Sequence, residues 1–98
     1  MQKHIEILLV EDNEGDIEMT RRALRHGKVD YSLSIANDGV EALHLLRKEN
    51  GFSDAPNPQL ILLDLNMPRM DGKRFLEIIK QDPSLRIIPV IMLSLIHI

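Results

Sequence analysis

Short apolar runs divide the chain, and a polar turn follows the first two of them. The runs are 5–10, 60–63 and 88–94. Nearly continuous apolar runs of this length are typical of strands buried on both faces of a parallel sheet. A fourth segment differs, because Tyr31, Leu33 and Ile35 alternate with serines. This alternation predicts a strand with one polar face, at the edge of the sheet.

The segments between these strands carry helical patterns. Over residues 16–26, one face of a helix would carry Ile17, Thr20, Ala23 and Leu24, and Gly27 can end the helix. Glu18 lies four residues before Arg22, a spacing that supports a helix through an ion pair.

A second helix is predicted after the turn at Asp38. Asp38 and Glu41 have the three-residue spacing of a capping box. The helix would turn Val40, Leu43 and Leu46 inward and end at residues 50–51, an Asn-Gly pair.

A third helix is predicted from the stripe of Phe75, Leu76 and Ile79, and it stops before Pro83. Strands and helices therefore alternate along the chain. This order predicts right-handed crossovers, a parallel sheet and an α/β fold. Without repeats or linkers, residues 1–98 are expected to form a single domain.

Carboxylates follow two of the buried strands. Glu11 and Asp12 come directly after the run 5–10, and Asp64 comes directly after the run 60–63. Ligands of open parallel sheets bind beyond the carboxyl ends of the strands, so we expect these groups to meet if the strands are neighbours. Three carboxylates so close favour a hard divalent cation, and Mg²⁺ fits best. Asp64 would then be a nucleophile for phosphoryl transfer, within reach of the Ser94 hydroxyl.

Each of these residues also has a simpler interpretation. Asp12, Asn13 and Asp16 can all be helix caps, and Ser94 can be a strand-end hydroxyl with a backbone partner. The functional interpretation rests on their coincidence, because the acidic pair, the lone aspartate and the hydroxyl all end buried strands on one side of the sheet.

Composition narrows the possible partners. The net charge is −3 without a basic patch, which argues against nucleic acid as a ligand. The chain has no cysteine and no apolar run of the roughly 20 residues needed to cross a membrane. A cytoplasmic protein is expected.

Three segments resemble the receiver domains of bacterial two-component response regulators. They are 7–13, 60–68 with the Asp71-Gly72 pair, and 88–94. In this order they are similar to the family's first strand with its acidic pair, its phosphorylation-site strand, and its fourth strand with a switch hydroxyl. The resemblance implies a flavodoxin-like fold, with helices on both faces of a parallel sheet in the order 2-1-3-4-5.

The resemblance also implies roles for single residues. Asp64 would accept a phosphoryl group from a histidine kinase, and Ser94 would be the switch hydroxyl. Mg²⁺ would be held by Asp12, Asp64 and the backbone carbonyl of Asn66, with Glu11 acting through a water molecule. The loop before the third strand is similar to that of stand-alone receivers found with phytochrome-type kinases. Any catalysis would be limited to phosphotransfer onto the chain itself and autodephosphorylation.

The C-terminal end departs from the family pattern. The family continues into a fourth helix, a fifth strand with a lysine that binds the phosphoryl oxygens, and a fifth helix, and residues 95–98 do not resemble it. We therefore expect an incomplete, C-terminally truncated receiver whose last strand is a sheet edge. The first-helix face of Ile17, Ala23 and Leu24 would be partly uncovered. Exposed apolar edges promote association, so a dimer through these surfaces is expected.

Two other functions compete with phosphoryl acceptance. A phosphatase of the haloacid-dehalogenase type also uses an aspartate nucleophile with Mg²⁺, but it carries a second aspartate where this chain has Asn66. The alternative that stays open is a receiver-like binding module that takes no phosphoryl group, because the family's lysine is missing.

Overall fold

The predicted alternation of strands and helices is confirmed by a computed structural model, which describes residues 3–64 and 72–93. The elements are β1 (His4–Val10), α1 (Glu14–His26), β2 (Asp30–Ala36), α2 (Gly39–Arg47), β3 (Leu60–Asp64), α3 (Gly72–Gln81) and β4 (Val90–Leu93). Two residues of the predicted site, Asn66 and Ser94, lie outside the described residues.

The strands form one parallel sheet in the order β2-β1-β3-β4. This order agrees with the flavodoxin-like arrangement implied by the resemblance. The strands β1 and β3 occupy the centre, where residues 7–10 and 61–64 are buried. The two strands with carboxylates at their ends are therefore neighbours.

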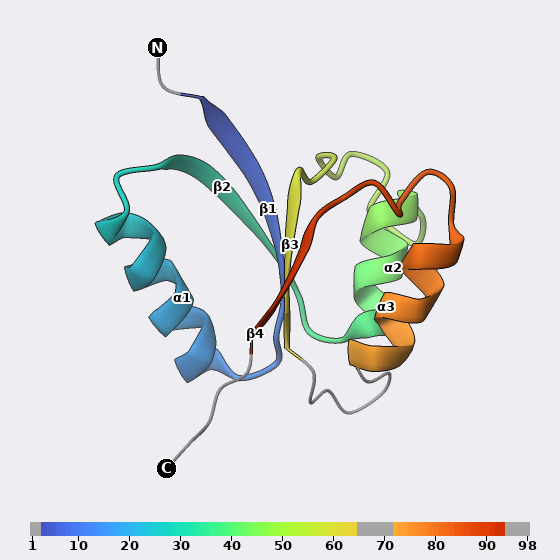
Figure 1. Cartoon of the computed structure of the whole chain (residues 1–98), viewed down its shortest axis with the longest axis horizontal. Helices are drawn as coiled ribbons and strands as arrows, with labels where there is room; N and C mark the ends of the chain where they lie inside the picture. Colours follow the sequence, from blue (N-terminus) through green and yellow to red (C-terminus); the bar gives the residue numbers. More distant parts are fainter. Residues whose placement is uncertain (1–2, 65–71, 94–98) are drawn as a thin grey trace.

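The core has two layers because successive side chains of a strand point to opposite faces of the sheet. Leu8, Val10 and Leu63 belong to the larger cluster, which α2 and α3 cover. Ile7, Leu9 and Leu62 belong to the smaller cluster, against which α1 packs. Figure 1 shows α1 alone on one face of the sheet and α2 with α3 on the other.

The prediction for α2 was wrong in two details. Ala42 and Leu45 are buried beside the expected Leu43 and Leu46, whereas Val40 is only half-buried. The helix also ends before Asn50-Gly51, because Lys48 adopts the left-handed conformation at φ 57° and serves as its C-cap. The Lys48 amide then donates to the Leu45 carbonyl at 3.2 Å, which closes the last turn.

The last predicted strand is shorter than expected. The Ile88 amide donates to the Leu85 carbonyl at 3.0 Å, so this residue belongs to a turn and β4 begins at Val90. As expected, β4 lies at one edge of the described sheet. Its side chains Ile91 and Met92 are about half exposed.

The helix α1 is also less covered than the others. None of its side chains is fully buried, and Ala23 is exposed on the face that was expected to be open. The predicted ion pair is present, with 3.6 Å between the Arg22 Nε and a Glu18 carboxylate oxygen. Within the described ranges, no helix is long and apolar enough to cross a bilayer.

Candidate functional site

The sheet register brings two carboxylates to the same place. Val10 pairs with Leu63, so the next residues, Glu11 and Asp64, lie side by side where β1 and β3 end. The Glu11 amide donates to the Ala36 carbonyl at 2.9 Å, which extends the bonding between β1 and β2 by one residue. The backbone of this site is therefore fixed by the sheet.

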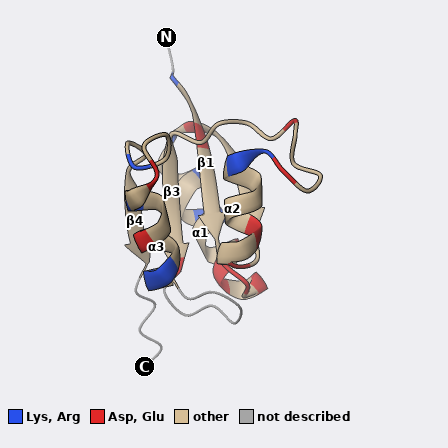
Figure 2. Ribbon diagram, turned by 90° about the vertical axis from the view of Figure 1, so that its right-hand side faces the viewer, with Lys and Arg blue, Asp and Glu red and all other residues tan. Residues whose placement is uncertain are grey.

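The three carboxylates expected from the sequence do meet. Glu11, Asp12 and Asp64 each offer one oxygen, and these oxygens all lie within 4.8 Å of one another. Glu11 is 1% exposed and Asp64 9% exposed, whereas Asp12 faces solvent. Figure 2 marks acidic residues in red on the ribbon at this end of the molecule, where β1 ends and α1 begins.

Glu11 is the most buried member of the cluster. Its Oε1 accepts a hydrogen bond from the Asn13 amide at 3.0 Å, and its buried Oε2 has no partner in the described part of the chain. Burial raises the pKa of Glu11 to about 7, against the Asn13 hydrogen bond, which lowers it. The negative charges of Asp64 and Asp16 contribute to the same rise.

The oxygen set fits a divalent cation. Keeping two buried carboxylates ionised so close together costs free energy unless a positive charge lies near them. A cation would supply that charge, and one of its water molecules could bond the buried Glu11 Oε2. Asp12 leaves the site open to solvent on one side. Hard oxygen ligands with room for water suit Mg²⁺ or Mn²⁺ better than a softer metal.

The turn that leads into α1 belongs to the site. Asn13 is the N-cap, and its Oδ1 accepts a hydrogen bond from the Asp16 amide at 2.9 Å. Asp16 lies in the first helical turn, where negative charge is favourable. The sequence identified both residues as possible caps, but its pattern gave no sign that Asn13 also anchors Glu11.

This geometry agrees with a comparison with protein families, in which the response regulator receiver domain matches residues 7–97. The chain belongs to the response-regulator receiver family. Within the family, Response regulator Rcp1 of Synechocystis sp. is 42% identical over 91 residues, which are 93% of this receiver and 62% of Rcp1.

Solved structures agree with the fold of this receiver. The phosphorylated cyanobacterial phytochrome response regulator RcpA is 44% identical with a TM-score of 0.85, over 92% of this chain and 64% of RcpA. The Mn²⁺-bound form of Rcp1 is 41% identical with a TM-score of 0.85, over 90% of this chain and 63% of that one. The receiver thus spans less than two thirds of these relatives.

Proposed function

We propose that this receiver takes part in phosphorelay signalling by accepting a phosphoryl group on Asp64. The observation that carries the proposal is the meeting of Asp64 with Glu11 and Asp12, in which a buried carboxylate oxygen of Glu11 lacks a partner. A histidine kinase is the proposed donor. The phosphorylated state reported for RcpA is a property of that relative and supports the proposal by likeness.

The chemistry assigned to Asp64 is nucleophilic. A carboxylate oxygen of Asp64 would attack the phosphorus of a phosphohistidine, an acyl phosphate would form, and the nitrogen–phosphorus bond would break. The imidazole would leave and take up a proton from solvent. Mg²⁺, when bound by Asp12 and Asp64 with Glu11 acting through water, would neutralise charge on the phosphoryl oxygens.

Two further roles stay predictions. The backbone carbonyl of Asn66 is proposed as a third Mg²⁺ ligand, and the Ser94 hydroxyl is proposed as the group that responds to phosphorylation. Both residues lie outside the described part of the chain. A cytoplasmic location is likewise a prediction.

Intact-mass spectrometry after incubation with acetyl phosphate tests the proposal. We expect one base-labile phosphoryl group per chain in the presence of Mg²⁺, and none when EDTA removes the metal. A folded chain that gains no phosphoryl group under either condition would contradict the proposal. The binding-module alternative would then be favoured.

The proposed kinase is of the phytochrome type. RcpA, 44% identical to this receiver, is described as a phytochrome response regulator, which supports the proposal by likeness. Transfer from a purified phytochrome-type histidine kinase, faster than from kinases of other classes, is the result that this proposal requires.

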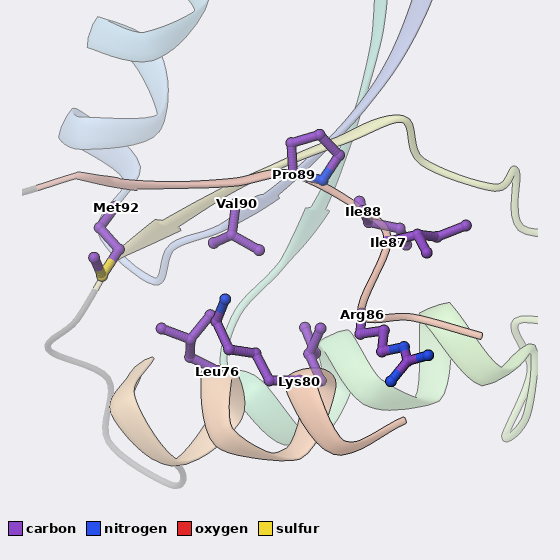
Figure 3. Close-up of a pocket in the computed structure, with 9 residues that line it drawn as sticks. Leu76, Lys80, Arg86, Ile87, Ile88, Pro89, Val90 and Met92 are labelled. Atoms are coloured by element: carbon purple, nitrogen blue, oxygen red, sulfur yellow. The ribbon is translucent and has the colours of Figure 1, made fainter. Parts of the chain in front are cut away.

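We further propose that two copies associate through the outer edge of β4. The strand contains no charged residue, and three of the large exposed apolar side chains, Ile87, Ile91 and Met92, lie in it or just before it. Figure 3 shows a groove beside this edge, in which Lys80 and Arg86 lie next to apolar side chains such as Leu76 and Val90. The strand edge itself is uncharged, and such an edge is self-complementary when two copies pair antiparallel.

Substitution of the edge tests this association. We expect the unaltered chain to be a dimer at concentrations of tens of micromolar, and Met92→Lys to be monomeric because a charge on the edge opposes pairing. Val29→Lys is the matched control, since Val29 is also exposed but lies in the turn before β2. Size-exclusion chromatography with light scattering gives the masses. A monomeric unaltered chain, or dimeric Met92→Lys, would rule this interface out.

A further inference from the structure

Asn13 makes three hydrogen bonds in the turn between β1 and α1. Its Oδ1 accepts from the Asp16 amide at 2.9 Å, and its carbonyl accepts from the Ile17 amide at 3.0 Å. Its own amide donates to the Glu11 Oε1 at 3.0 Å. One residue therefore caps the helix and also anchors a carboxylate of the acidic cluster.

The anchor determines how Glu11 is presented. Its Oε1 is occupied by the Asn13 amide, so the oxygen left for a cation is the buried, unpartnered Oε2. The anchoring group is a backbone amide, whose direction depends on the conformation of the turn. That conformation is fixed from the other side by the bond between the Asn13 side chain and Asp16.

We propose that Asn13 is a positioning residue of the divalent-cation site, which acts on the cation through Glu11. The inference rests on the proposed function, because it assumes that the acidic cluster binds a divalent cation. Residues that orient metal ligands without touching the metal commonly affect affinity by a factor of ten or more. Asn13 would belong to this class, since its cap fixes the amide that holds Glu11.

Gly15 supports the same inference independently. A glycine in the first turn of a helix is a poor helix former, and an alanine is ordinarily better there. A Cβ at Gly15 would, however, come within 3.1 Å of the Asn13 Oδ1, closer than such contacts normally are. The missing side chain leaves room for the cap oxygen of Asn13.

Binding of Mn²⁺ alone, followed by electron paramagnetic resonance, tests the proposal. We expect Asn13→Ala to weaken Mn²⁺ binding about fivefold, toward the lower end of such effects because the backbone amide itself remains. Asn13→Ser keeps a capping oxygen and is expected to bind like the unaltered chain. Gly15→Ala is expected to weaken binding about twofold although it does not lower the melting temperature of the metal-free chain.

Leu24→Ala is the matched control for lost stability. Leu24 packs near the other end of α1, so its truncation lowers the melting temperature and leaves Mn²⁺ affinity unchanged. A folded Asn13→Ala chain that binds Mn²⁺ as tightly as the unaltered chain would overturn the role of Asn13 alone. An unaltered chain that binds no Mn²⁺ would overturn the cation site itself, and the proposed function with it.

Discussion

Asp64→Asn is expected to take up no phosphoryl group from acetyl phosphate, under conditions in which the unaltered chain is labelled. The amide has nearly the same volume as the carboxylate, so the buried end of β3 stays packed. It lacks the nucleophilic oxygen, and the loss of labelling is therefore complete rather than partial. Intact-mass spectrometry measures the result directly.

The substitution should also stabilise the metal-free fold. Asp64 is one of the charges that raise the pKa of Glu11, and its removal relieves repulsion between two buried groups. Asp54→Asn is the matched control, because Asp54 is exposed in the loop before β3 and is expected to change neither labelling nor stability. Labelling of folded Asp64→Asn at another residue would show that the nucleophile was assigned wrongly.

Much of the fold could be predicted because the strongest signals are local. The apolar runs that became β1 and β3 are buried on both faces, and such runs differ clearly from the alternating pattern of β2. The convergence of Glu11 with Asp64 followed from the topology. Once β1 and β3 are neighbours in a parallel sheet, residues that end the two strands must lie together.

The details that were missed depend on tertiary context. Ala42 is small and gives a weak signal of its own, yet it is buried because α2 lies against the sheet. The end of α2 at Lys48 requires a lysine in the left-handed conformation, which is usually adopted by glycine or asparagine. The link from Asn13 to Glu11 uses a backbone amide, which every residue type but proline carries, so no residue pattern can announce it.

The second large effect concerns Glu11 and pH. The metal-free chain is expected to lose stability as the pH rises from about 4.5 to about 7. In this window the unfolded chain has released the Glu11 proton while the folded chain still holds it, so the free energy of unfolding falls as the pH rises. Below the window both states are protonated, and above it both are ionised, so the change is confined to it. The expected loss is on the order of 3 kcal/mol, because a difference of one pKa unit corresponds to about 1.4 kcal/mol.

Glu11→Gln isolates this contribution from those of the other carboxylates. Glutamine keeps the shape of the side chain and cannot ionise, so the variant should match the unaltered chain near pH 5 and be more stable near pH 8. Urea unfolding at a series of pH values gives both free energies. If the free energies of unfolding of the two chains differ by the same amount at every pH, Glu11 does not hold its proton in the folded state.

Near pH 8, Mg²⁺ should make the unaltered chain more stable than Glu11→Gln, which is the reverse of the order expected without metal. A cation that binds only the folded chain raises the free energy of unfolding. This rise grows with the logarithm of the ratio of the cation concentration to the dissociation constant. The positive charge of the cation, acting on Glu11 through bound water, would favour the ionised carboxylate, so the Mg²⁺ affinity should rise as the pH passes through about 7. The unaltered chain would then gain more from Mg²⁺ than Glu11→Gln does. Equal stabilisation of both chains by Mg²⁺ would mean that the cation binds away from Glu11. Protonation alone would then relieve the repulsion within the acidic cluster.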